Sequence, residues 1–163
     1  RVHEGNNCRR CIKCSRKITK MKIILISTGS KNDLGPQAIS KFLEKNNHKT
    51  GIIFYKKENL KDILLRCRNS GLIVISANVA THKIASEIFK RLRSINKPLA
   101  YAGVYPFLYP TEAIKETDLV IIKNPKETIL ELANRLENFQ KISDIPNLWF
   151  KATGKEIIKN YKK

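Results

Sequence analysis

The chain has 163 residues and a formal net charge of +18, and 42% of its residues are hydrophobic. This length and apolar content suit one domain with a buried core and exclude a disordered chain. No apolar run approaches the roughly 18 residues that a membrane-spanning helix needs, and no signal peptide is visible, so we expect a cytoplasmic protein without membrane contact.

Residues 1–20 differ from the rest of the chain, because they are polar and basic and follow no hydrophobic period. Cys8, Cys11 and Cys14 lie in this stretch with C-x2-C-x2-C spacing. Thiolates at such a spacing can bind a soft metal or an iron–sulfur cluster, although three are one short of the usual four. The alternative is an unstructured extension that is dispensable for folding, with the folded domain beginning at Met21.

More than half of the excess positive charge lies in two end segments, residues 1–20 and 151–163. Lysine and arginine side chains that replace counterions around phosphates give weak, salt-sensitive nucleic-acid binding without sequence preference. The basic ends are therefore candidates for such binding. Solvated ends of a lysine-rich protein explain the same charge, because the sequence lacks the aromatic and arginine-rich patches that base recognition uses.

Five short apolar runs predict β-strands, and a helical pattern follows each of them. The runs lack polar alternation, which is typical of strands buried on both faces of a parallel sheet. The predicted strands are residues 22–27, 50–55, 72–76, 98–102 and 118–122. The predicted helices begin at Pro36, Leu60, Thr81, Pro110 and Glu127.

These five β/α units indicate an α/β fold, a doubly wound five-stranded parallel sheet of flavodoxin-like order 2-1-3-4-5 with helices on both faces. Residues 141–163 predict a small β-hairpin that turns at residues 152–154. The chain thus divides into a basic extension (1–20), a Rossmann-like domain (21–140) and a hairpin with a linker (141–163). The core positions we expect to be buried are Leu25, Val74, Ile75, Ala100 and Ile121.

Ligands of open parallel sheets bind at the carboxyl ends of the strands. In this sequence that edge collects the loops 28–35, 77–81, 103–109 and 123–126. Their Ser, Thr, Asn and Gly residues offer hydroxyl, amide and backbone groups to a large planar ligand. Gly103 in particular permits a tight turn or a close approach of a ligand to the backbone.

Little catalytic chemistry is visible in the sequence. His48 and His82 suit capping or surface positions. Asp33 and Asp118 have no evident partner. The sequence contains neither a phosphate-binding loop of the G-x-x-x-x-G-K-[ST] type nor a G-x-G-x-x-G dinucleotide fingerprint.

The order of these features resembles the cobalamin-binding domain that precedes the radical S-adenosylmethionine (SAM) barrel in cobalamin-dependent radical SAM proteins. The resemblance covers about residues 21–160. It lies in an ordered set of segments, residues 34–36, 47–49, 72–78, 102–106, 127–128 and 145–150. The family has a Gly-Glu turn where this chain has residues 123–125, Lys-Asn-Pro.

The resemblance implies that the domain holds a corrin for methyl transfer or related radical chemistry and is not catalytic by itself. It places the 4Fe-4S cluster and SAM in a radical SAM barrel, in cis or in trans, because the C-x3-C-x2-C motif of that barrel is absent from this sequence. The chain would then be a piece of such an enzyme or a free-standing binding domain. The cofactor-contacting positions implied are Thr28, Gly29, Ser30, Asn32, Gly35, Ser76, Ala77, Asn78, Thr81, Ala102, Gly103, Val104, Tyr105 and Asn124.

One departure from the family pattern concerns the ligand of the cobalt. The family's D-x-H-x-x-G motif, aligned so that it ends at Gly35, has Ser30 in the Asp place and Asn32 in the His place. The amide nitrogen of Asn32 has no available lone pair. We expect His48 at the opposite edge of the sheet and His82 along the corrin edge. The resemblance therefore implies base-off cobalamin without a histidine ligand, with water or nothing below the cobalt.

Two other interpretations stay open. The chain could be a flavodoxin-like binding module without cobalamin that uses its basic ends on nucleic acid or on a protein. Alternatively, residues 8–14 could form an iron–sulfur site. A C-x3-C-x2-C motif encoded downstream of Lys163 would favour the cobalamin interpretation.

Overall fold

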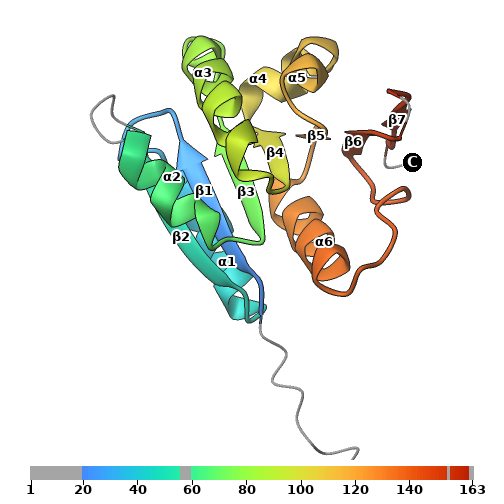
Figure 1. Cartoon of the computed structure of the whole chain (residues 1–163), viewed down its shortest axis with the longest axis horizontal. Helices are drawn as coiled ribbons and strands as arrows, with labels where there is room; N and C mark the ends of the chain where they lie inside the picture. The colour runs from blue at the N-terminus through green and yellow to red at the C-terminus, as the bar shows by residue number, and fades with distance from the viewer. Residues whose placement is uncertain (1–19, 56–59, 154, 162–163) are drawn as a thin grey trace, which may run out of the picture.

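The computed structural model of the chain describes residues 20–55, 60–153 and 155–161, which form one sheet with helices on both faces (Figure 1). The strand order is β2-β1-β3-β4-β5-β6-β7. The strands are β1 Lys22–Ser27, β2 Lys49–Phe54, β3 Leu72–Ser76, β4 Leu99–Ala102, β5 Leu119–Ile121, β6 Leu148–Lys151 and β7 Ile157–Lys159. The first five strands are parallel and in the order predicted, so the prediction of a doubly wound α/β sheet is confirmed.

The helices connect successive strands. They are α1 Leu34–Lys45, α2 Leu60–Arg68, α3 His82–Leu92, the 3-10 turn η2 Arg93–Ile95, α4 Val104–Leu108, α5 Pro110–Glu116 and α6 Pro125–Glu137. Residues of α2, α3 and α5 pack in one core cluster, and residues of α1 and α6 pack in the other. The two clusters lie on opposite faces of the sheet, as right-handed crossovers require.

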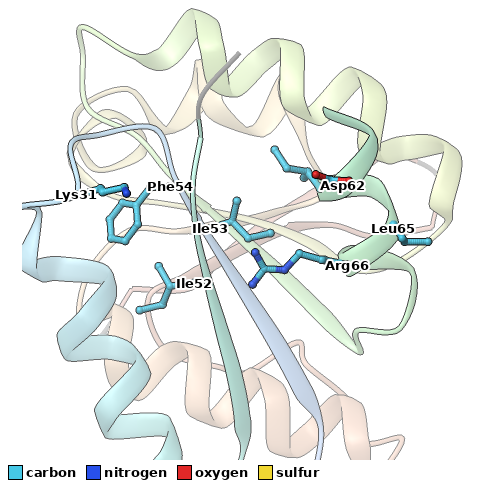
Figure 2. A pocket seen from close by; sticks show the side chains of 8 residues that line it. Lys31, Ile52, Ile53, Phe54, Asp62, Leu65 and Arg66 are labelled. Atoms are coloured by element: carbon cyan, nitrogen blue, oxygen red, sulfur yellow. The ribbon is translucent and has the colours of Figure 1, made fainter. Parts of the chain in front are cut away.

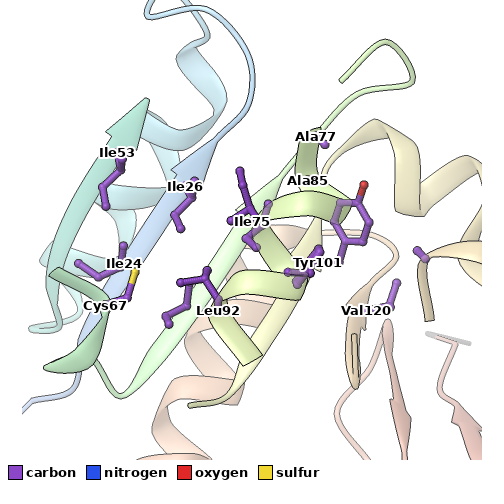
Figure 3. Close-up of a cluster of buried hydrophobic side chains, with 14 of the residues drawn as sticks. Ile24, Ile26, Ile53, Cys67, Ile75, Ala77, Ala85, Leu92, Tyr101 and Val120 are labelled. Atoms are coloured by element: carbon purple, nitrogen blue, oxygen red, sulfur yellow. The ribbon is translucent and has the colours of Figure 1, made fainter. Parts of the chain in front are cut away.

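Alternate residues of each central strand enter the two clusters. In β1, Ile24 and Ile26 face the α2–α3 side (Figure 3), whereas Ile23 and Leu25 face the α1–α6 side. This explains why the strand sequences are continuously apolar, because both faces of the sheet are buried. The five core positions predicted from the sequence, Leu25, Val74, Ile75, Ala100 and Ile121, are all buried.

The C-terminal hairpin extends the main sheet. Strand β6 runs antiparallel to β5, with Val120 opposite Trp149, and β7 pairs with β6. Because β6 pairs with β5, the hairpin covers an edge of β5 that would otherwise expose unpaired backbone groups. Ile145, just before β6, is fully buried. The turn runs from Ala152 to Glu156, whose backbone groups are hydrogen-bonded at 2.8 Å, and Gly154 lies outside the described residues.

Three local predictions differ from the structure by two residues or more. Helix α6 begins at Pro125, inside the predicted 123–126 loop and ahead of Glu127. Helix α1 begins at Leu34, ahead of Pro36, because Asp33 caps it: the Asp33 carboxylate accepts a hydrogen bond from the Gly35 N–H at 3.1 Å. Asp33 therefore has a partner that the sequence did not reveal. Residues 104–108 of the predicted 103–109 loop form the short helix α4, which Gly103 precedes.

Candidate functional site

Hydrogen bonds of side-chain hydroxyl groups connect the loops at the carboxyl ends of β1 and β3. The Thr28 hydroxyl, just after β1, lies 2.6 Å from the Thr81 hydroxyl and 3.0 Å from the Ser76 carbonyl oxygen. Thr81 also closes a turn with Asn78, because its N–H donates to the Asn78 side-chain oxygen at 3.0 Å. These predicted ligand-contacting groups are therefore engaged in bonds that fix the two loops relative to one another.

A second close contact joins the loop after β3 to the turn after β4. Gly103 has φ +108°, and a Cβ placed on it would lie 2.6 Å from the Ala77 carbonyl oxygen. The same carbonyl oxygen accepts a hydrogen bond from the Tyr105 N–H at 3.1 Å. Glycine is required at position 103 both by this backbone conformation and by the approach of Ala77. The close approach predicted at Gly103 is thus made within the protein itself.

These contacts surround a cavity of about 220 Å³ at the carboxyl edge of the sheet, which we call the edge cavity. Its lining residues are mostly small: Gly29, Asp33, Gly35, Pro36, Ile39, Ser76, Ala77, Asn78, Ala102, Gly103, Val104 and Pro125. The structure thus brings together predicted residues from three separate loops. Six of the predicted residues do not line this cavity: Thr28, Ser30, Asn32, Thr81, Tyr105 and Asn124. Asn124 instead lines two neighbouring cavities near the start of α6.

Three apolar residues of the edge cavity were not predicted: Pro36, Ile39 and Pro125. Pro36 and Ile39 lie on the first turns of α1 and are buried. They are three positions apart and so share one helix face. That spacing is a signal in the sequence, but it indicates only a buried face and gives no indication that the face also reaches a cavity.

Aromatic rings flank the edge cavity on the α3–α4 side. His82 and Tyr105 are stacked, with ring centroids 4.5 Å apart and an angle of 7° between the rings. His82 Nδ1 lies 2.7 Å from the Val79 carbonyl oxygen, a contact in which Nδ1 donates. His82 is thus held in place as the first residue of α3, whereas Thr81 occupies the N-cap position.

Beneath this stack, the Tyr101 hydroxyl is buried and has no hydrogen-bond partner among the described residues. Burial is the main reason why the pKa of Tyr101 lies well above the ordinary value for tyrosine. Burial likewise raises the pKa of Tyr105, and the nearby carboxylates of Glu112 and Glu116 add to this effect. Both phenols therefore stay neutral at physiological pH and contribute apolar surface with a polar end.

Several large apolar side chains at the same edge of the sheet are exposed, and we call them the apolar rim. They are Leu34, Val79, Val104, Phe107, Leu108 and Tyr109. Leu34 is 70% exposed, and Val104 also lines the edge cavity. Large apolar side chains gathered beside a cavity are typical of a surface that meets a ligand or another protein domain.

A further cavity of about 450 Å³ lies along the outer strand β2 (Figure 2). Lys31, Phe54, Asp62 and Arg66 are among its lining residues. It is larger than the edge cavity, but none of the predicted ligand-contacting residues lines it. We therefore assign the candidate site to the edge cavity, where the strand ends converge.

The remaining polar residues singled out in the sequence have structural partners. His48 is buried, which corrects the expectation of a surface position, and its Nε2 lies 3.0 Å from the Asn134 side-chain oxygen. The Asp118 carboxylate, for which the sequence gave no partner, lies 3.7 Å from the Lys151 ammonium. Cys8, Cys11 and Cys14 lie outside the described residues.

The described residues lack both a metal-binding cluster and a membrane-spanning helix. Residues 20–55, 60–153 and 155–161 contain no cluster of three or more His, Cys, Asp or Glu side chains that could hold a metal ion. Within the same ranges, no helix has the length and apolar character that crossing a membrane demands.

Comparison with known proteins finds similarity at the level of structure. No protein-family model and no curated protein sequence matches the chain. The fold is similar to that of the cobalamin-dependent SAM radical enzyme OxsB, solved with aqua-cobalamin and SAM bound, with a TM-score of 0.75 and 16% identity over 90% of this chain. It is also similar to the radical SAM methyltransferase TsrM from Kitasatospora setae, solved with cobalamin and a [4Fe-4S] cluster bound, with a TM-score of 0.73 and 13% identity over 88% of this chain.

At these identities the similarity is one of fold. The chain spans 23% of the length of OxsB and 29% of the length of TsrM, so it corresponds to one region of each of these larger proteins.

Proposed function

We propose that this chain is a cobalamin-binding domain that serves a radical SAM barrel, in cis or in trans. The observation that carries the proposal is the edge cavity, which is enclosed by three loops at the carboxyl ends of β1, β3 and β4. The chain shares its fold with OxsB and TsrM, both of which have been solved with a cobalamin bound. Bound cobalamin supplies a cobalt centre for methyl transfer or related radical reactions.

The residues at the edge cavity fit a large planar ligand that lies across the sheet edge. The cavity of about 220 Å³ is smaller than most pockets that enclose a whole ligand, so it suits one side group while the ring stays outside. A Cβ on Gly29 would lie 3.2 Å from an Asp33 carboxylate oxygen, so a larger residue there would narrow the opening. Gly29, Asn78 and Gly103 would contact the side group, and Val104 would contact the ring.

The apolar rim supports the second half of the proposal, the radical SAM partner. Val79, Phe107 and Leu108 remain substantially exposed beside the edge cavity. A catalytic domain that covers the cavity would bury them and would exclude water from the ligand, which strengthens electrostatic interactions inside the site. The cluster and SAM belong to that partner in this proposal, and the chain contributes binding and positioning.

A titration with aqua-cobalamin, followed by its visible absorption, tests the proposal. We expect a saturable spectral change at micromolar concentrations with the full chain. Val104→Trp should weaken binding, because the larger side chain would cover the edge cavity from an exposed position. Leu65→Trp is the matched control, since Leu65 is exposed on α2 beside the β2 cavity. No spectral change would refute the proposal and favour a flavodoxin-like binding module without cobalamin.

A further inference from the structure

A cavity of about 500 Å³ lies at the amino ends of β4 and β5, opposite the edge at which the candidate site is found. Four basic side chains from separate segments line it: Arg93, Lys97, Lys115 and Lys151. They come from η2, the turn before β4, the last turn of α5 and the end of β6. The fold brings Lys115 and Lys151 beside Arg93 and Lys97, so a concave basic surface results.

Two of the four cations lack an acidic partner among the described residues. The Arg93 guanidinium donates one hydrogen bond, at 2.9 Å, to the backbone carbonyl oxygen of Glu116. Lys97 makes no ion pair or hydrogen bond with any residue of the described part of the chain, although it is half-buried. Partial burial of an unpaired ammonium is unfavourable, so an anion bound beside it would offset that cost.

The acidic residues of this cavity leave room for an anion. The Glu116 carboxylate accepts a hydrogen bond from the Ser86 hydroxyl at 2.9 Å. The Asp118 side chain is 80% exposed and lies 3.7 Å from the Lys151 ammonium, a separation typical of a weak surface ion pair. Lys115 lines the cavity but is paired with Glu112, an exposed residue of α5 that does not line it. Arg93 and Lys97 are therefore the groups available to a ligand.

We propose that this basic cavity binds a phosphate-bearing ligand. The Arg93 guanidinium and the Lys97 ammonium, four residues apart on the stretch from η2 to β4, suit the several oxygens of a phosphate, because charge-assisted hydrogen bonds to such oxygens are stronger than neutral ones. The phosphate group belongs either to a small molecule such as a diphosphate or to the backbone of a polynucleotide. The cavity lies at the far edge of the sheet from the proposed cobalamin site, and the two cavities have no lining residue in common.

Isothermal titration calorimetry of the full chain tests the proposal with two probes, inorganic pyrophosphate and a single-stranded oligonucleotide. The double variant Arg93→Gln/Lys97→Gln should bind at least one of these probes about tenfold more weakly, or worse, than the unmodified chain. The control is Lys41→Gln/Lys45→Gln, which removes the same charge from exposed positions on α1. The control should bind both probes nearly as well as the unmodified chain.

The outcomes separate the two sources of phosphate. Weakened pyrophosphate binding would identify a small phosphate-bearing ligand, and weakening confined to the oligonucleotide would identify a polynucleotide backbone. The single variant Lys97→Gln should show the same direction of change without loss of folding, because Lys97 contributes no bond within the described residues. Equal weakening by the basic-cavity and control variants would attribute binding to overall charge and overturn the proposal, as would the absence of binding.

Discussion

The imidazole of His48 is held against Asn134, with 3.0 Å between His48 Nε2 and the Asn134 side-chain oxygen. The two residues are 86 positions apart in the sequence. His48 lies in the turn between α1 and β2, and Asn134 lies on α6. Since both helices cover the same face of the sheet, this hydrogen bond joins them at their packed ends.

The first prediction concerns this bond. His48→Ala should lower the free energy of unfolding by about 1–3 kcal/mol, because it removes the bond and leaves the Asn134 oxygen without its donor. Urea denaturation followed by the fluorescence of Trp149, the one tryptophan of the sequence, gives the measurement. A double-mutant cycle with Asn134→Ala should show coupling between the two positions. Unchanged stability in His48→Ala would contradict the prediction.

The second prediction concerns the turn after β4. Gly103→Ala should destabilise the protein by about 1–3 kcal/mol, because the new Cβ would meet the Ala77 carbonyl oxygen at a positive φ. Gly51→Ala is the control: the atom nearest to its Cβ would be the terminal Cδ1 methyl of Ile24, at 2.9 Å, which can move. Thermal unfolding of the two variants gives the comparison. A loss of stability in Gly103→Ala no larger than that in Gly51→Ala would contradict the prediction.

Much of this fold could be predicted from the sequence, since strands buried on both faces carry uninterrupted apolar runs. The limits of β1 and β3 were predicted to the residue. Helix α4 was missed because Gly103 and Pro106 are typical of a turn, although proline is also tolerated in the first turn of a helix. The position of His48 was wrong because a periodic pattern reveals where a helix ends and not which distant helix packs beside it.

The candidate site was predictable in its location more than in its contacts. The topology rule predicted the edge of the sheet at which the edge cavity lies, and glycine at position 103 indicated a close backbone approach. Sequence reasoning could not show that the hydroxyl groups of Thr28 and Thr81 bond to one another. Polar loop residues offer the same hydrogen-bonding groups whether they bind a ligand or a neighbouring loop, and only their placement in space separates the two cases.

The third prediction is an alkaline loss of stability caused by Cys67, which is fully buried on α2. Burial raises the pKa of this thiol from 9.0 to about 11, although the positive charges of Arg66 and Lys22 reduce the effect. Between these two values the unfolded chain releases the proton while the folded chain retains it. The stabilising contribution is therefore complete below pH 9 and declines toward pH 11, with a slope that approaches about 1.4 kcal/mol per pH unit.

Comparison with Cys67→Ala isolates this effect, because the tyrosines and lysines that titrate in the same range are common to both proteins. The difference in the free energy of unfolding should be constant below pH 9 and should shrink between pH 9 and pH 11. A difference that stays constant through that range would show that the thiol titrates equally in the folded and unfolded chains.

The last prediction concerns the lower ligand of bound cobalamin and rests on the proposed function. Among the described residues, His48 is buried against Asn134 at the far end of α1, and His82 is held by Val79 and stacked on Tyr105. Neither arrangement directs an imidazole from the loop after β1, where Asn32 occupies the position of the family's ligand. We therefore expect base-off cobalamin without a histidine ligand from this chain.

Electron paramagnetic resonance of the bound cob(II)alamin checks this expectation, because a coordinated nitrogen splits the cobalt lines into triplets. The unmodified chain should show no such triplets, whereas Ser30→Asp/Asn32→His should show them, since it restores a histidine with a carboxylate to orient it. Uniform ¹⁵N labelling of the protein turns triplets into doublets only when the nitrogen belongs to the chain. Doublets from the labelled, unmodified protein would mean that His82 or His48 coordinates the cobalt, and would refute the prediction.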